Sequence, residues 1–548
     1  MHASGVRGAP RVALALVVLA ALGVAGAPRV RATATARAPA LPAIVFVSRL
    51  PPEGVEAGQV PGLGPHGTFA GSGGRLMERA PDGRVRGLLP PGRLHDVADP
   101  AVSEDGREVA FAGRERPGGP WRIWSVPRAY PPSATASEPR CRTCDGDPAA
   151  GDDADPAWWG DTLLHVSTRA GGRSLYDGSP ATQLWALLPD GRRVRLTSEP
   201  NGVLDPVADR AAGRVFIARW WFNPFGMVPS GGASRGERAP GDTVNVWQVV
   251  SARLASARSA GLALEDVRLA AGGTLPRRSG MGLQPALLAA GGVLAVAARN
   301  TGLAPRPGAL AIHAFGPPPG RGVRVSGAAI GDEAGEAYRE GANLAAPAAC
   351  APAALGDGRF LCALDPGGRG EFGLCLVSRD GAAHEMLVDE PGRWELDPAV
   401  VPAGAPAARG GTGSAQASQR QAGAGSPAPR HDRARAPLAA VPTFRYLARD
   451  LYAGSGAPAR RDDAVLHVFR LDGEDSARAV GRSNVPRSGR VDLMLPADVP
   501  LFEVLTDRSG RVLTNARGIA QVRGFNAGAP GAVSRCAGCH LGHSARRP

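Results

Sequence analysis

The stretch HDVADPAVSEDGREVAFAGR, residues His95–Arg114, decides the fold, because degenerate copies of it recur along the chain. Each copy has a polar lead, an Xaa-Pro step, a turn and an apolar strand. Between the copies lies a second strand pair, which in several places turns at Asp-Gly, as in QLWALLPDGRRVRLT at residues 183–197. The copies are centred on Pro100, Pro156, Pro206, Pro285, Pro352 and Pro398, which are 46 to 79 residues apart.

This repeat predicts a β-propeller. Asp-Gly is a strong signal for a two-residue hairpin, because glycine accepts a positive φ angle. Units of several short strands that recur every 40 to 50 residues or so are typical of propeller blades. With AIVFVSR at residues 43–49 as a first strand, we expect an all-β fold with six blades, or seven. A pair of β-sandwiches is the alternative, because strand patterns alone do not show that a ring closes.

The composition agrees with a turn-rich β protein and argues against nucleic-acid binding. Aromatic residues make up 5% of the 548 residues, whereas the chain holds 75 glycines and 51 prolines. The formal net charge is +13, yet all 63 basic residues are arginines scattered through turns. Nucleic-acid binders concentrate their basic residues in a patch or stripe, often beside aromatic residues that stack on bases. We therefore expect no nucleic-acid partner.

The N-terminus reads as an export signal covering residues 1–36. Arg7 and Arg11 precede an apolar run at residues 12–27, and the small-residue stretch RATATA follows, which favours cleavage after Ala34 or Ala36. The run is short for a membrane span, which needs about 20 residues, although an uncleaved anchor is the alternative. We expect a mature protein with no stable membrane span in an oxidising, extracytoplasmic space such as the periplasm.

Composition shifts divide the rest of the chain. Residues 37–401 hold the propeller repeats. Residues 402–439 lack aromatic side chains and are rich in Gly, Pro and Ala, so they predict a disordered linker. Residues 440–548 contain further short strands, such as AVLHVFRL and VPLFEVL, and predict a small β domain.

The C-terminal tail contains the motif for attachment of a c-type haem. Cys536, Cys539 and His540 form Cys-Xaa-Xaa-Cys-His, in which two thiols add to the haem vinyl groups and the histidine binds the iron as proximal ligand. Behind an export signal this motif predicts one covalent haem c. A disulfide or a zinc half-site is the alternative.

The distal side of this haem is less defined by the sequence. His543 is expected on the same helical face as His540, so it cannot reach the opposite side of the haem, and an exposed role is favoured. His467 is a distal candidate because it shares a strand face with apolar residues, although a buried core histidine is the simpler interpretation. Met494 and His431 are weaker candidates, and a five-coordinate haem stays open.

The other cysteines are not haem sites. Cys141 and Cys144 repeat the spacing, but Asp145 stands where the histidine would be, so a local disulfide is expected and a zinc half-site is the alternative. Among the three remaining cysteines, two are expected to be able to pair, with one left over. These three are Cys350, Cys362 and Cys375.

Several segments resemble one family. DPAVSEDGREVAFAG, GDGRFLCALDPGG, FGLCLVSRDG and DPAVVP resemble the propeller of the hydrazine synthase alpha subunit and its relatives. LYAG, PADVPLFEVLTDRSGRVL and RCAGCH resemble the haem-bearing domain that follows it. The resemblance spans about residues 42–543 and implies that Cys536, Cys539 and His540 are the haem residues. That subunit has an additional haem in an N-terminal domain, whereas this sequence holds a single Cys-Xaa-Xaa-Cys-His motif and is not expected to include such a domain, so hydrazine synthesis itself is not expected.

These features favour an exported haem protein that passes electrons to a redox partner protein, with the propeller docking that partner. A haem enzyme or sensor with an open axial site is an alternative. A propeller scaffold without redox function, with the tail cysteines in a disulfide, is another. Propellers support binding and catalysis alike, so the fold does not choose between them.

Overall fold

The computed structural model describes a defined part of the chain. It covers residues 40–51, 73–128, 137–144, 151–174, 179–223, 244–257, 261–271, 281–288, 293–298, 310–315, 323–327, 348–367, 371–378, 381–402, 442–452, 464–471, 477–499, 501–513, 528 and 530–536. The expected signal peptide, almost all of the expected linker, His431, Cys539, His540 and His543 lie outside these residues.

The described residues form β-strands and no helix, which confirms the all-β prediction. Those of the first six sheets are β1 (Ile44–Arg49), β2 (Arg75–Arg79), β3 (Val85–Gly87), β4 (Asp96–Val102), β5 (Glu108–Arg114), β6 (Arg122–Pro127), β7 (Arg140–Cys141), β8 (Asp153–Trp159), β9 (Thr162–Ser167), β10 (Gln183–Leu187), β11 (Arg193–Arg195), β12 (Val203–Asp209), β13 (Arg214–Asn223), β14 (Val244–Ala257), β15 (Gly261–Ala271), β16 (Met281–Leu287), β17 (Val293–Ala298), β18 (Leu310–Phe315), β19 (Val323–Gly327), β20 (Ala348–Ala354), β21 (Phe360–Asp365), β22 (Gly373–Val377), β23 (His384–Val388) and β24 (Trp394–Val400).

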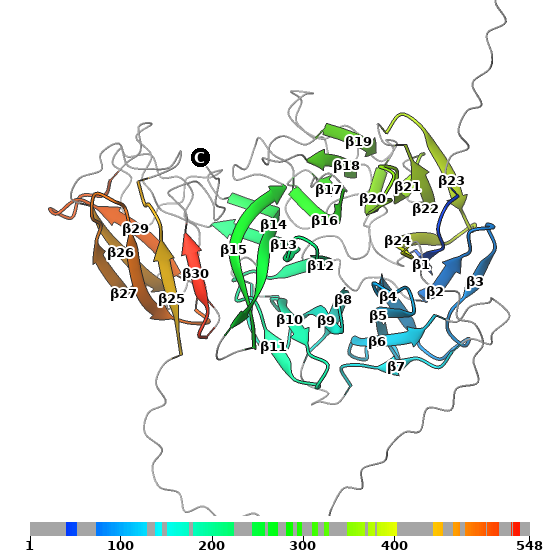
Figure 1. Ribbon diagram of the computed structural model, residues 1–548, viewed down its shortest axis with the longest axis horizontal. Helices are drawn as coiled ribbons and strands as arrows, with labels where there is room; N and C mark the ends of the chain where they lie inside the picture. Colours follow the sequence, from blue (N-terminus) through cyan, green and yellow to red (C-terminus); the bar gives the residue numbers. More distant parts are fainter. Residues whose placement is uncertain are drawn as a thin grey trace, which may run out of the picture. The chain divides into compact units, whose positions relative to one another are not determined.

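These strands form six four-stranded antiparallel sheets, which are the blades of a propeller (Figure 1). The first blade has the order β24-β1-β2-β3, and the second to sixth blades follow in chain order from β4 to β23. Within the described part of the chain, each innermost strand contacts the innermost strand of the next blade, from β4 through β8, β12, β16 and β20 to β24 and back to β4. The ring is therefore closed, which rules out the pair of sandwiches.

Ring closure joins the two ends of the propeller sequence in one sheet. The last strand, β24, pairs antiparallel with the first strand, β1, so that Ile44 lies opposite Val400 and Arg49 opposite Trp394. The Ser48 hydroxyl also donates to Glu395 Oε1 at 3.1 Å. Hydrogen bonds between residues about 350 positions apart thus hold the first blade together.

The hairpins form where the Asp-Gly turns predict them. Gly83 has a φ of +91°, a value that residues with a Cβ rarely adopt. The preceding Asp82 accepts a hydrogen bond from the amide of Arg84 at 3.1 Å and fixes the turn. Short strands on either side then place alternate apolar residues between the blades, where they form the buried core.

The Xaa-Pro step of the repeat is a β-bulge in each innermost strand. Strand register shifts at this step in all six cases. The residue before each proline has a positive φ between 46° and 54°, which is uncommon for a residue other than glycine. These six residues are Asp99, Asp155, Asp205, Gln284, Ala351 and Asp397.

The last strands form a small sandwich of two three-stranded sheets. Their bounds are β25 (Thr443–Ala448), β26 (Val465–Leu471), β27 (Ala477–Asn484), β28 (Val491–Pro496), β29 (Leu501–Thr506) and β30 (Val533–Cys536). One sheet has the order β28-β25-β30 and the other the order β27-β26-β29. Their shared core includes Phe444, Tyr446, Leu466 and Leu505, all at most 2% exposed. No helix within the described ranges is long and apolar enough to cross a membrane.

Candidate functional site

The backbone of Cys536 is fixed at an edge of the small sandwich. It is the last residue of β30, which runs parallel to β25 and places Cys536 opposite Ala448. At the start of this pairing, Arg445 donates its amide to Ala532 O at 2.9 Å, and Gly531 donates to Thr443 O at 2.8 Å. The first residue of the predicted haem motif therefore leaves a defined point of a sheet.

Cys536 lies at the end of the sandwich where both sheets meet a connecting turn. Ala448 pairs with Val491 as well as with Cys536. In the other sheet, Asn484 pairs with Val465, and Val465 with Thr506. Because only residues 485–490 connect β27 to β28, these strand ends lie at the same end of the sandwich.

His467 lies at this end but belongs to the other sheet. It is half-buried on β26, and its Nε2 lies 3.0 Å from the Thr506 hydroxyl. Its ring stacks on Phe469 at 6.2 Å between centroids, and Phe469 stacks on Phe502 at 5.2 Å. Partial burial, helped by the charge of Arg482, lowers the pKa of His467, so the ring is neutral near pH 7.

The structure therefore does not bring His467 and Cys536 together on one sheet. Met494, the weaker candidate, lies on β28 in the same sheet as Cys536 and is 60% exposed. Its register partner Arg445 lies opposite Val533, three residues before Cys536. Sequence reasoning placed His467 first because it shares a strand face with Val465 and Phe469, and Phe469 does stack on its ring.

The cysteines of the propeller divide into one bonded pair and three thiols. Cys141 and Cys144 form a disulfide. Cys350, Cys362 and Cys375 are fully buried and form no disulfide, so the pairing expected for two of them does not form, although Cys362 lies directly opposite Cys375 on the neighbouring strand. Burial raises the pKa of Cys350 well above its usual value and that of Cys375 to about 11, so both stay protonated thiols.

The structure also reveals a ring that the sequence reasoning missed. The six positive-φ residues of the bulges lie on the innermost strands, and hydrogen bonds link four of them from blade to blade. The backbone amide of Asp205 donates to Asp155 Oδ2 at 3.0 Å, and the backbone amide of Gln284 donates to Asp205 Oδ2 at 2.9 Å. The Ala351 amide donates to Gln284 Oε1 at 2.7 Å. One sequence signal could have revealed this ring: an aspartate or a glutamine precedes five of the six prolines.

The other aspartates of the ring interact through their charges, since Asp155 and Asp397 both raise the pKa of Asp99. The chain of hydrogen bonds ends at one residue. Ala351 interrupts the ring, because its methyl group cannot accept the hydrogen bond that the other five side chains can.

The four aspartates hold protons more tightly than usual. Burial, reinforced by the charge of Asp155, raises the pKa of Asp99 and of Asp205 well above the usual range. Burial also raises the pKa of Asp155, and it raises the pKa of Asp397 to about 6 even though Arg49 opposes the shift. The ring therefore carries less negative charge near neutral pH than its four carboxyl groups suggest.

The raised pKa values of these four aspartates predict that the stability of the propeller falls as the pH rises. A carboxyl group whose pKa is raised by folding contributes its stability fully below the ordinary aspartate pKa, and the contribution is lost as the pH rises through the raised value. Asp99→Asn should therefore stabilise the protein by about 1–3 kcal/mol at pH 8 and by little at pH 4. Urea unfolding at both pH values measures this. Asp190→Asn, on an exposed turn, is the control, and an equal effect of Asp99→Asn at both pH values would contradict the prediction.

The interruption of the ring predicts a stabilising substitution. Ala351 has a φ of +49°, where asparagine is tolerated better than alanine. Asparagine would also restore a side-chain acceptor, so Ala351→Asn should stabilise the propeller by about 0.5–1 kcal/mol. Ala353→Asn on the same strand, outside the positive-φ position, should bring no gain. Equal midpoints of chemical denaturation for both variants would count against the explanation.

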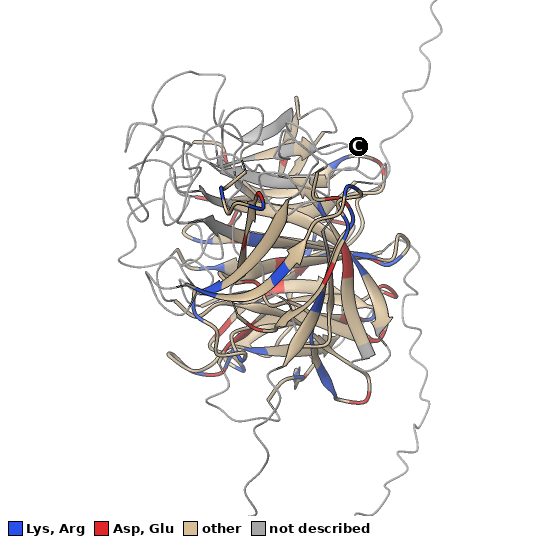
Figure 2. Cartoon of the chain, turned by 90° about the vertical axis from the view of Figure 1, so that its left-hand side faces the viewer, with Lys and Arg blue, Asp and Glu red and all other residues tan. Residues whose placement is uncertain are grey.

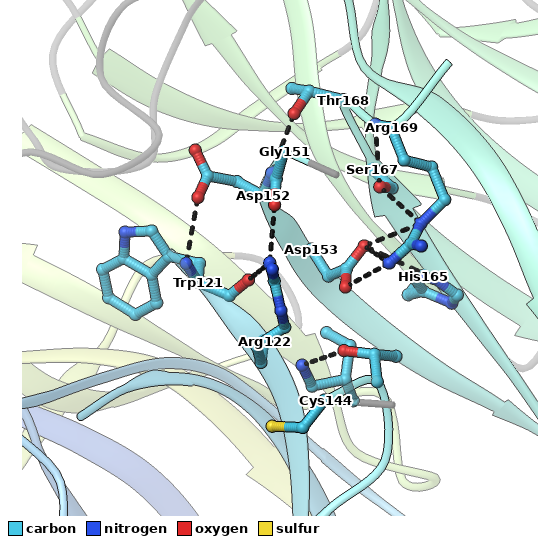
Figure 3. A network of polar contacts seen from close by, with 12 residues as sticks. Trp121, Arg122, Cys144, Gly151, Asp152, Asp153, His165, Ser167, Thr168 and Arg169 are labelled. Atoms are coloured by element: carbon cyan, nitrogen blue, oxygen red, sulfur yellow. Dashed lines mark hydrogen bonds and ion pairs between the residues drawn. The ribbon is translucent and has the colours of Figure 1, made fainter. Parts of the chain in front are cut away.

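A second polar network joins the second and third blades, where the amide of Trp121 donates to Asp152 Oδ1 at 2.9 Å (Figure 3). Arg169 binds both carboxylate oxygens of Asp153, at 2.7 and 2.6 Å, and Asp153 is fully buried. His165 lies 3.9 Å from Asp153 and is also fully buried. Burial lowers the pKa of His165 to about 4, so it is neutral near pH 7 and out of reach of a dissolved substrate. This network is best explained as a structural joint between blades.

Charges on the described strands are mixed in sign (Figure 2). Arg445 pairs with Asp492 at 2.6 Å, and Arg210 pairs with Glu104 at 2.7 Å. In each of these pairs the arginine and the acidic residue neutralise each other locally. The absence of a nucleic-acid partner stays a prediction from the sequence.

Comparison with known proteins finds similarity at the level of solved structures. No protein-family model matches the sequence, and no curated protein matches it either. Among solved structures, the chain is similar to a hydrazine synthase from Kuenenia stuttgartiensis, with a TM-score of 0.60 and 13% identity over 92% of this chain and 69% of that one. This similarity shows a shared fold.

More remote similarities are to the propeller domain of a protease and to a peptidase. One is to the β-propeller domain of the Trilobed protease from Pyrococcus furiosus, with a TM-score of 0.30 and 10% identity over 59% of this chain and 76% of that one. Another is to an acylaminoacyl peptidase from Pyrococcus horikoshii, with a TM-score of 0.29 and 11% identity over 58% of this chain and 42% of that one.

Proposed function

We propose that this protein is an exported c-type haem protein that exchanges electrons with a redox partner protein. The observation that carries the proposal is the position of Cys536 at the end of a paired strand, directly before Ala-Gly-Cys-His. Two thiols and an imidazole in this order are the donor set that covalent haem attachment requires. A haem bound there would supply one-electron chemistry.

The residues of this chain would have three tasks. Cys536 and Cys539 would hold the macrocycle through thioether bonds, and His540 would bind the iron from the proximal side. The pairing of β30 with β25 would keep the attachment point rigid, which favours a defined distance for electron transfer. The end of the sandwich next to Cys536 would exclude part of the solvent, and a less polar surrounding raises the reduction potential of a haem.

One observation favours the alternative of an open axial site. The Nε2 of His467 is engaged by Thr506, and His467 lies on the sheet that does not contain Cys536. Without a distal protein ligand, a small molecule could bind the iron, as in a haem enzyme or sensor. The similarity to the hydrazine synthase supports a distant relationship, but we do not transfer its named activity, because only one haem motif is present in this chain.

The test is the visible spectrum of the full chain, expressed with an export signal and a c-type haem maturation system. We expect one covalently bound haem per chain by protein mass and a reduced spectrum typical of c-type haem. A spectrum unchanged by carbon monoxide would support electron transfer, and a shifted spectrum would support the open-site alternative. A mature protein without covalent haem would overturn the proposal.

A further inference from the structure

The two cysteines of the disulfide between Cys141 and Cys144 differ in their exposure to solvent. Cys141 ends the two-residue strand β7, which pairs with β6 at the outer edge of the second blade, and it is half-buried. Cys144, three residues on, is exposed. An attacking thiolate can therefore reach the sulfur of Cys144 much more readily than that of Cys141.

The turn between the two cysteines is held by contacts that do not need the disulfide. Arg142 donates its amide to Ile123 O at 2.7 Å, and Ile123 donates its amide to the Thr143 hydroxyl at 3.0 Å. The Arg142 guanidinium pairs with Glu108 at 3.0 Å and lies over the ring of Trp158 at 5.8 Å. Because these contacts fix both residues inside the loop, the turn should keep its shape when the bond is cut.

The disulfide also adds little to the cohesion of the blade. In the chain-entropy model, the stabilisation by a disulfide grows with the length of the loop that it closes, and this loop spans only three residue steps. A disulfide that solvent can reach and that adds little stability is better suited to reversible reduction than to a purely structural role. The three buried cysteines lack such access.

We propose that Cys141–Cys144 is a thiol–disulfide exchange site for a dithiol reductant. A thiolate of the dithiol attacks Cys144 Sγ, the bond between the two sulfurs breaks, and Cys141 leaves as a thiolate. The second thiol of the dithiol, as its thiolate, then attacks its own sulfur in the mixed disulfide and releases Cys144. In total, two electrons and two protons pass to the protein, and the dithiol becomes a disulfide.

The surroundings of Cys141 stabilise the thiol that it becomes on reduction. Its Sγ lies 3.7 Å from the carbonyl oxygen of Ile123, so the thiol that forms on protonation has an acceptor in place. After reduction, the two sulfurs stay close because the turn is fixed, which allows the bond to form again.

The test uses the full chain in buffers with graded ratios of reduced to oxidised dithiothreitol, which is a dithiol, followed by alkylation and peptide mapping. We expect Cys141 and Cys144 to be reduced together while Cys350, Cys362 and Cys375 stay unlabelled. In the reduced protein, Cys144 should be alkylated about tenfold faster than Cys141, because thiol reactivity follows exposure. The proposal is independent of haem, since mapping reads only the peptide with residues 141 and 144.

Single variants keep the test decisive. Cys141→Ser should form a stable mixed disulfide at Cys144 with added glutathione disulfide, releasing one glutathione thiol, whereas Cys144→Ser should react far more slowly at the half-buried Cys141. Equal rates for the two variants would overturn the assignment of Cys144 as the attacked sulfur. A pair that stays oxidised until the protein unfolds, when the three buried cysteines also become labelled, would overturn the exchange site itself.

Discussion

Replacing Cys536 and Cys539 together by alanine is expected to abolish covalent haem attachment while the propeller stays folded. The two thioether bonds are the covalent link to the macrocycle, so no covalent haem can remain without them. The propeller closes through β24 and β1, and neither strand depends on the tail. Protein mass and the visible spectrum measure the haem, and circular dichroism with thermal unfolding measures the fold.

Two single variants in the same tail separate attachment from ligation. His540→Ala should keep the covalent bonds but give an unstable or wrongly ligated haem, visible as a changed spectrum. His543→Ala is the matched control and should leave mass and spectrum unchanged. Loss of the propeller fold in the double cysteine variant would show instead that the tail is a structural element.

Asp96→Ala should be the most destabilising single substitution considered for the propeller. The Asp96 carboxylate is fully buried and binds Arg49 at 2.9 Å and Arg114 at 3.1 Å. It also accepts the amides of Gly74 and Val97, at 2.9 and 3.0 Å. Its removal leaves the buried guanidinium of Arg49 without its partner, which costs about 3–5 kcal/mol. Urea unfolding of the wild type and the variant measures the difference.

An exposed ion pair of the same kind provides the control. Glu115 pairs with Arg93 at 3.1 Å, and its side chain is 59% exposed. Because solvent screens such pairs, Glu115→Ala should change the free energy of unfolding by less than about 1 kcal/mol. A similar loss for both variants would mean that burial does not set the contribution of Asp96.

The sequence predicted the blades because their signals are local. Each Asp-Gly turn and each short apolar strand lies within a window of about twenty residues, in which backbone preference and side-chain alternation act directly. The proline of each repeat was found in the same way. Its role as a bulge with a positive φ at the preceding residue was not, because proline normally disfavours such a conformation before it.

The candidate site could be predicted only in part. The order of Cys536, Cys539 and His540 identifies a chemistry by itself, since the motif is contiguous. The choice of His467 as distal candidate used strand alternation, which tells the faces of one strand apart but not which of two sheets a strand joins. The structure assigns β26 and β30 to different sheets, and that assignment depends on pairing between distant segments.

By itself, the sequence determined the all-β class, the repeated blade and the tail motif, because each depends on residues that are close together in the chain. Only the tertiary structure decided that β24 closes the propeller beside β1, that Asp96 binds Arg49, and that hydrogen bonds link four of the six bulge residues. These features join residues tens to hundreds of positions apart. Their energies come from burial and from the exclusion of water between blades, which no local pattern specifies.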